Sequence, residues 1–258
     1  MRLTFFGTGT SIGVPVIGCQ CETCQSSDPR DKRLRCSAFL EFDNPKASFL
    51  IDAGPDFRTQ MLANSKTSID AVFLTHIHYD HVGGLDDLRG VNYSTRRSID
   101  VYARQDVADG VMRNLYYAFS PSRYPGSPKM TMNVIANDTF TVAGHSVTPL
   151  PILHGNLPIV GFRFDNFAYI TDAKQVPEDT IKLAQGVDTL VINALQPREH
   201  PSHLNLEQAI TIARQIGARQ TFFTHMSHEM GQHATRTPNL PHSMALAYDG
   251  LQVEIPGF

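Results

Sequence analysis

Histidines and aspartates gather directly after a short apolar run, and this arrangement constrains the fold more than any other feature of the sequence. Residues 71–74 (AVFL) are typical of a buried β-strand, and the next seven residues read THIHYDH, from Thr75 to His81. On extended backbone, side chains two residues apart point the same way, so the imidazoles of His76 and His78 face one side. The sequence therefore predicts a strand whose end carries enough ligands for two metal ions.

Other apolar runs predict two successive groups of strands with helices between them. We expect strands at 3–6, 38–42, 49–51, 71–74, 147–153, 160–164, 167–170, 189–192 and 220–223, and helices at 107–117, 177–184 and 206–216. This order favours two sheets packed face to face and covered by helices, an α/β four-layer sandwich formed by residues 1–258 as one domain. The loop 120–129, rich in Pro and Ser, is a candidate lid.

Three later strand-like runs also end in a potential metal ligand, namely His154, Asp172 and His225. With the first cluster, they resemble the ligand set of the metallo-β-lactamase superfamily of hydrolases, which implies an αββα sandwich and a dinuclear metal site. The resemblance implies that one metal binds His76, His78 and His154, that the other binds Asp80, His81 and His225, and that Asp172 bridges both.

Two metal ions at such a site would hold a bridging hydroxide as the nucleophile, so we expect a hydrolase. A His-rich site with carboxylates accepts zinc, manganese or iron. Asp52, at the end of the run 49–51, can accept a ring N–H from a ligand histidine and fix its tautomer. The alternative of a strand-end turn residue stays open for Asp52.

Three of the four cysteines lie close together, at Cys19, Cys21 and Cys24. Three thiolates suit a tetrahedral structural zinc that needs one more ligand, and His228, three residues after His225, is the candidate. Three reduced cysteines in a flexible loop are the alternative. Cys36 stands apart and is expected to be a buried small apolar residue.

This zinc knuckle, at about 19–24, and the segment 7–15 (GTGTSIGVP) add a finer resemblance, to the PhnP type of phosphodiesterase associated with carbon–phosphorus lyase metabolism. The resemblance implies hydrolysis of small cyclic phosphodiesters, manganese or zinc in the dinuclear site, and a homodimer. It also implies that His203 binds phosphate and acts as a general acid, so Asp80 and His203 are the expected catalytic residues. His200 and a local capping role for His203 remain alternatives. Segment 92–129 matches no motif of that type.

The net charge and the ligand set also bear on several other possible functions. A net charge of −3 provides no basic field for a nucleic acid polymer, which disfavours a tRNA 3′-processing nuclease. The complete ligand set disfavours a pyrroloquinoline quinone biosynthesis protein and a non-catalytic zinc-stabilised binding module. An acyl, thioester or lactone hydrolase on the same dimetal scaffold remains the main alternative. The sequence contains neither a secretory leader nor an apolar run approaching ~18 residues, so a cytoplasmic location without membrane contact is expected.

Overall fold

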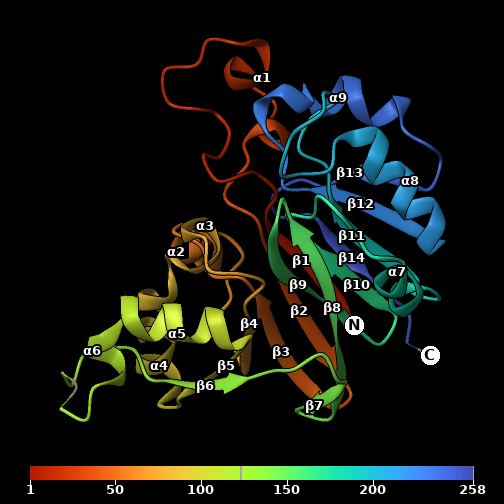
Figure 1. Ribbon diagram of the computed structural model, residues 1–258. Helices are drawn as coiled ribbons and strands as arrows, with labels where there is room; N and C mark the ends of the chain where they lie inside the picture. The colour runs from red at the N-terminus through yellow and green to blue at the C-terminus, as the bar shows by residue number, and fades with distance from the viewer. Residues whose placement is uncertain (123, 258) are drawn as a thin grey trace.

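Two seven-stranded sheets pack face to face in the computed structural model, which describes residues 1–122 and 124–257 (Figure 1). The strands of the first sheet lie in the order β14-β1-β2-β3-β4-β5-β6. Their bounds are β14 (Gln252–Glu254), β1 (Arg2–Gly7), β2 (Ser37–Asp43), β3 (Lys46–Ile51), β4 (Ala71–Phe73), β5 (Ile99–Ala103) and β6 (Met130–Val134). Strands β14 to β3 pair antiparallel, and β3 to β6 pair parallel.

The second sheet repeats this division, with the order β13-β12-β11-β10-β9-β8-β7. Its strands are β13 (Met244–Leu246), β12 (Gln220–Thr224), β11 (Thr189–Asn193), β10 (Phe167–Ile170), β9 (Leu157–Phe164), β8 (His145–His154) and β7 (Phe140–Val142). Strands β7 to β10 form antiparallel hairpins, whereas β10 to β13 run parallel.

Helices cover the outer face of each sheet (Figure 1). Beside the first sheet lie α2 (Phe57–Ala63), α3 (Tyr79–Val82), α4 (Leu88–Thr95), α5 (Gln105–Asn114) and α6 (Tyr116–Phe119), and beside the second lie α7 (Glu178–Ala184) and α8 (Leu206–Ile216). The short helices α1 (Glu22–Gln25) and α9 (His233–Arg236) belong to loops. Buried phenylalanines, among them Phe49, Phe73 and Phe162, fill the space between the sheets. The predicted four-layer αββα sandwich is therefore confirmed.

Parallel pairing brings the carboxyl ends of several strands to one edge, where open α/β sheets commonly place their ligands. The chain leaves β4 into Thr75, β10 into Thr171, and β12 into His225. These are the points at which the sequence places its candidate metal ligands, so the two sheets present them toward a shared site.

The segment 92–129 differs from its prediction. The expected helix 107–117 is divided into α5 and α6, with Leu115 between them. Lys129, the last residue of the expected lid 120–129, is held beside α4, because the side chain of Asn92 bonds its backbone N–H and C=O at 2.8 and 3.0 Å. A lid role for this loop stays a prediction. In the part of the chain that the structure describes, no helix is long and apolar enough to cross a membrane.

Candidate metal centre

The candidate metal ligands form groups at the shared strand edge. The nitrogen atoms of His76, His78 and His154 lie within 4.8 Å of one another. A second group joins Asp80, His81 and His225, and Asp172 forms a third with His76 and His81. Asp172 thus contacts members of both sets, and its role as a bridging ligand stays a prediction. One set would hold each metal ion, with Asp172 shared.

Interatomic distances show how tightly the second group is built. His81 Nε2 lies 3.2 Å from Asp80 Oδ2 and 3.3 Å from Asp172 Oδ2. His225 Nε2 lies 3.0 Å from Asp172 Oδ1. Yet the Nε2 atoms of His76, His81 and His225 are buried and make no hydrogen bond to any residue that the structure describes. Buried nitrogens without partners are costly, and a metal ion would satisfy all three, so these residues fit a dimetal site.

Electrostatics point to the same conclusion. Burial favours the neutral form of His225, but the negative charge of Asp172 outweighs it and raises the pKa of His225 to about 10. Asp172 is also buried, and the histidines around it more than offset that effect and hold its pKa well below its usual range. Negative carboxylates are therefore balanced by protonated imidazoles when no metal is bound. Metal ions would replace those protons.

Asp52 orients two of the ligand histidines. His81 Nδ1 donates to Asp52 Oδ2 at 2.7 Å, which leaves Nε2 for the metal. Thr75 donates its hydroxyl proton to the same carboxylate oxygen at 2.8 Å, so Thr75 Oγ1 must accept from His76 Nδ1, 3.0 Å away. Asp52 thus fixes the tautomer of His81 directly and that of His76 through Thr75.

Two further hydrogen bonds, which were not predicted from the sequence, orient candidate metal ligands. His154 Nδ1 donates to the backbone C=O of Ser202 at 2.9 Å. Thr171 donates to Asp172 Oδ2 at 2.6 Å. A threonine directly precedes a ligand at Thr75, Thr171 and Thr224, and this repeated pattern was the signal available in the sequence. No sequence pattern could have indicated the carbonyl of Ser202.

Backbone strain is concentrated at the site. Asp52, Asp172 and His225 have φ values of 60°, 57° and 55°, in the left-handed region that residues other than glycine rarely adopt. Asp52 and His225 directly follow the end of a strand, and Asp172 follows one after a single residue. The left-handed turn directs each side chain back toward the shared edge of the sheets. Strain of this kind is typical of functional sites. Gly54 has a steric role nearby, because a Cβ there would lie 2.0 Å from the backbone oxygen of Asp80.

His203 lies at the edge of the metal cluster. Its ring centroid is 4.5 Å from that of His154 and 5.0 Å from that of His225. Its Nδ1 is buried, lies 3.8 Å from Asp172 Oδ1, and has no hydrogen-bond partner among the described residues. Burial, assisted by the charge of His225, lowers the pKa of His203 to about 3. The imidazole is therefore neutral in the metal-free protein and has a free nitrogen facing the site.

The competing candidate His200 is farther out. Its ring centroid lies 5.1 Å from that of His203, and its Nδ1 accepts from the backbone N–H of Ser202 at 3.4 Å. A backbone N–H can only donate, so the proton of a neutral His200 ring is on Nε2. Burial lowers the pKa of His200, and the nearby His154 and Lys174 lower it further.

The three clustered cysteines and His228 form a second centre. Cys19 Sγ and Cys21 Sγ each lie 3.3 Å from His228 Nδ1, and Cys24 Sγ lies 3.6 Å from the same atom. Burial raises the pKa of Cys24 to about 11, so a thiolate there needs a cation beside it. The donor set and its convergence fit a structural zinc. Cys36 is separate and fully buried, as expected.

The two centres are connected by a short stretch of chain. His225 and His228 are three residues apart, and the backbone of Met226 bonds Thr8 and Thr10 at 2.8 and 3.2 Å. The buried side chain of Arg33 donates to the carbonyls of Ser227 and Gly231, each at 2.9 Å. The knuckle and the loop that carries both histidines are thus held as one unit.

Comparisons with known proteins agree with this geometry. Residues 48–226 match the model of the beta-lactamase superfamily domain. A structure described as a new diphosphatase from the PhnP family is 36% identical, with a TM-score of 0.91, over 99% of this chain and 98% of that one. Zinc-bound PqqB from Methylobacterium extorquens is 22% identical, covers 99% of this chain and 100% of its own, and has a TM-score of 0.78, which supports the fold alone.

A protein of Porphyromonas gingivalis named octanoyltransferase is 43% identical over 257 residues, which are 99% of this chain and 52% of that protein. The chain thus spans about half the length of this relative. The family match covers more than half of the chain, and its His and Asp side chains form clusters that could hold metal ions. The chain therefore belongs to the metallo-β-lactamase superfamily and is similar over its whole length to a diphosphatase of the PhnP family.

Proposed function

We propose that this protein is a metal-dependent hydrolase, and specifically a phosphodiesterase that acts on small, cyclic phosphodiesters. The observation that carries the proposal is the position of His203, whose free Nδ1 faces the metal cluster 3.8 Å from Asp172 Oδ1. Two divalent ions held by the cluster, Mn or Zn, would supply a strong nucleophile from water and would neutralise charge on phosphoryl oxygens. His203 would contact the phosphoryl group from the open side of the site.

Each protein group would have a separate role in the proposed reaction. Neutral His203 can donate one hydrogen bond to a phosphoryl oxygen, and a bound phosphate anion would favour its protonated form. The protonated ring would then give its proton to the departing alkoxide, as a general acid does. Asp80 and Asp172 would hold the reacting geometry through the metals, while Asp52 keeps His76 and His81 in the required tautomers.

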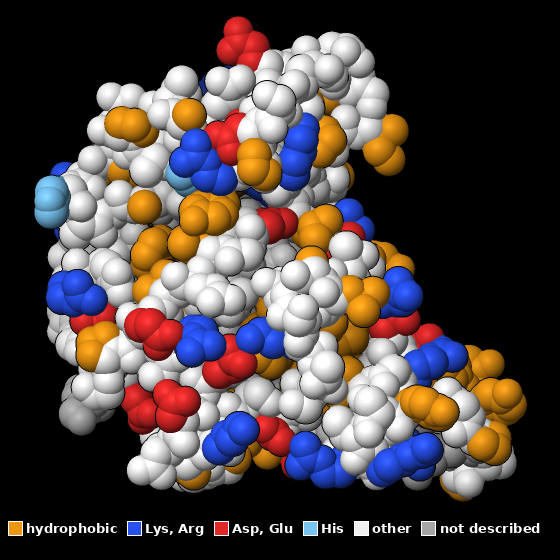
Figure 2. All heavy atoms as spheres, turned by 180° about the vertical axis from the view of Figure 1, so that it is seen from behind, with side chains coloured by type: hydrophobic (Ala, Val, Ile, Leu, Met, Phe, Trp, Pro, Cys, Tyr) orange, Lys and Arg blue, Asp and Glu red, His pale blue; other side chains and the backbone are white. Residues whose placement is uncertain are grey.

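Groups outside the cluster also favour an anionic substrate. Lys174 follows Asp172 by two residues, and its positive charge contributes to the lowered pKa of His200. The neutral His200 ring carries its proton on Nε2 and can donate it to an anion. A long nucleic acid would instead need an extended basic surface. On the face shown in Figure 2, Lys and Arg side chains are interspersed with Asp and Glu rather than gathered in one basic field. A small phosphodiester therefore fits the charges better than a long nucleic acid does.

A second candidate is hydrolysis of an acyl, thioester or lactone bond, because the same nucleophile attacks a carbonyl. The observation that favours it is the relative named octanoyltransferase, a name that denotes acyl chemistry. The free imidazole of His203 beside the carboxylates favours the phosphodiester, since a neutral ester gains less from such a group.

Hydrolysis of bis(p-nitrophenyl) phosphate by manganese-reconstituted protein tests the proposal directly. The matching phosphomonoester and a p-nitrophenyl thioester are measured under the same conditions, with chelator-treated protein as the blank. We expect the diester to be preferred, followed by activity on 2′,3′-cyclic nucleotides. Activity on the thioester alone would overturn the proposal in favour of acyl hydrolysis.

A matched pair of variants assigns any diesterase activity to the site. His203→Ala removes the proposed phosphate contact, whereas His242→Ala removes an exposed histidine outside the metal clusters. Diesterase activity should fall only in the first variant.

A further inference from the structure

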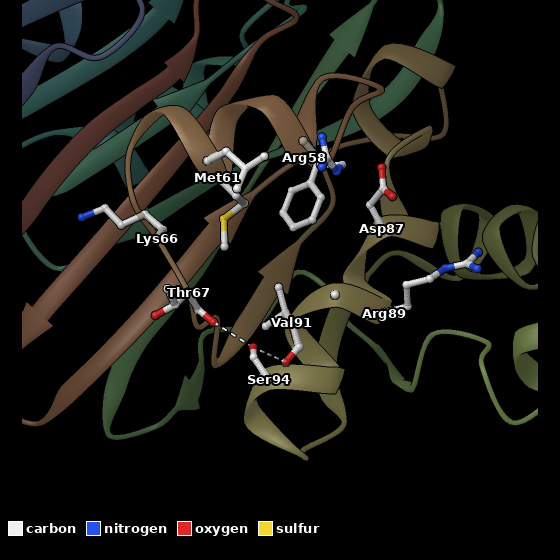
Figure 3. A pocket seen from close by; sticks show the side chains of 11 residues that line it. Arg58, Met61, Lys66, Thr67, Asp87, Arg89, Val91 and Ser94 are labelled. Atoms are coloured by element: carbon white, nitrogen blue, oxygen red, sulfur yellow. Dashed lines mark hydrogen bonds between the residues drawn. The ribbon is translucent and has the colours of Figure 1, made fainter.

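A separate cavity lies between α2 and α4, on the outer side of the first sheet (Figure 3). Its volume is about 460 Å³, within the range of small-molecule sites. The apolar part of its lining comes from Phe57, Met61, Leu62 and Val91. Leu62 is 63% exposed at the rim of the cavity. The cavity contains none of the metal-ligand candidates.

Cationic side chains outnumber acidic ones around this apolar surface. Arg58, Lys66 and Arg89 line the cavity, against a single carboxylate, Asp87. Lys66 is bound to Glu41 at 2.8 Å, and Arg89 is bound to Asp86. The guanidinium of Arg58 forms no ion pair or hydrogen bond with any residue that the structure describes, and it lies at one end of the cavity (Figure 3). An apolar ligand with one negative end would match this distribution.

Gly90 provides an independent indication that the cavity is kept open. It lies within α4, where glycine is destabilising relative to alanine, and a Cβ built there would meet no heavy atom within 4 Å. The contrast is Gly110 in α5, where a Cβ would lie 2.7 Å from Ile77 Cδ1, so packing requires glycine. Packing therefore does not require glycine at position 90, and a side chain longer than that of alanine would extend into the cavity that Gly90 lines.

We propose that the cavity between α2 and α4 binds a medium-chain fatty carboxylate, with its tail against Phe57, Met61 and Val91 and its carboxylate at Arg58. The apolar floor accounts for the tail, and the unpaired guanidinium accounts for the charged end. The binding site would be distinct from the metal centre.

The cavity is nevertheless in packing contact with the metal site. A Cβ on Gly84 would lie 2.7 Å from Phe57 Cβ and 2.1 Å from the backbone oxygen of Gly54. Gly54 in turn packs against the backbone of Asp80. An occupant that shifts Phe57 would therefore press on the loops that carry a metal ligand.

Calorimetric titration of the metal-loaded protein with hexanoate, octanoate and decanoate tests the proposal, with octanol as the uncharged probe. We expect saturable binding that tightens about fourfold with each added methylene until the cavity is filled. Octanol should bind more weakly than octanoate, and Arg58→Gln should remove that difference. Arg113→Gln, an exposed arginine on α5 outside the cavity, should preserve it.

Gly90 supplies the steric test. Gly90→Leu should abolish binding by filling the cavity, while Gly90→Ala, which gives the same backbone benefit with little added volume, should retain it. Leu62→Asp changes an exposed position and should also weaken carboxylate binding. The proposal is overturned if no carboxylate binds, if Gly90→Leu and Gly90→Ala bind octanoate equally, or if Gly90→Leu instead dissociates a dimer in sedimentation.

Discussion

The substitution Asp52→Asn should disable two metal ligands at once without changing the shape of the site. Asparagine tolerates the left-handed backbone that Asp52 adopts, so no new strain arises. The N–H of Thr75, 2.8 Å from Asp52 Oδ1, requires an acceptor, so the amide oxygen should take that position. The amide nitrogen then replaces Oδ2 and faces both His81 Nδ1 and Thr75 Oγ1.

An amide nitrogen can only donate, and this reverses both tautomers. His81 Nδ1 would have to accept, which puts the ring proton on Nε2, the atom that faces the metals. Thr75 would likewise give its proton to His76 Nδ1, with the same result at the other metal. Removal of such an orienting group typically costs about 10- to 100-fold in metal affinity, or about 1.4 to 2.7 kcal/mol.

Competition between the protein and a chelator measures this loss, with the zinc or manganese content counted at each chelator concentration. Both catalytic metals should bind more weakly in Asp52→Asn, while the Cys19–His228 centre keeps its zinc. Asp70→Asn is the matched control, because Asp70 binds Ser48 and Arg97 and touches no metal ligand. Unchanged affinity for both catalytic metals would refute the tautomer argument.

Three other outcomes are expected. His203→Ala should lower kcat on a diester by roughly 10² to 10⁴ with metal content intact, since it removes a proton donor, and an unchanged rate would remove His203 from the mechanism. Cys21→Ser changes an exposed side chain, so it should cost one zinc and lower the Tm more than kcat; full zinc content with an unchanged Tm would reject the structural role. Burial raises the pKa of Asp249 to about 7. Between pH ~4 and pH ~7 the carboxyl is therefore protonated in the folded protein and ionised in the unfolded chain, so the free energy of unfolding falls as the pH rises through this range. The free energy of unfolding in urea of the native protein, minus that of Asp249→Asn, should therefore fall by roughly 2 kcal/mol between pH 5.5 and pH 8. A difference that stays constant with pH would contradict the buried acid.

The sequence predicted the sandwich because its central strands are nearly continuous apolar runs with a ligand at the end. The runs at β4 and β10 are of this kind, and their bounds lie within one residue of those expected. Strands β5, β6, β7, β13 and β14 were not predicted. Four of them are the edges of the two sheets and β5 lies next to an edge, where a strand buries less surface and its pattern is weaker. The helix at 107–117 was extended too far because apolar periodicity continues across Leu115, although the chain turns there.

Site residues were predicted unevenly for a physical reason. Metal ligands have few chemical types and recur at fixed spacings, so the sets around His76 and Cys19 stand out in the sequence. Groups that act through hydrogen bonds carry no such spacing. The carbonyl of Ser202 and the guanidinium of Arg33 depend on how distant loops pack, and only the folded chain shows them.

Each sheet contributes about half of the ligands of the dinuclear cluster, with residues 76–81 from the first and His154, Asp172 and His225 from the second. The bound metals would therefore act as cross-links between the two halves of the sandwich. During synthesis, neither the dinuclear centre nor the cysteine centre can be completed until residues 225 and 228 have left the ribosome. Metal loading would thus follow assembly of both halves, and a chain that stops before residue 225 would hold neither centre in its finished form.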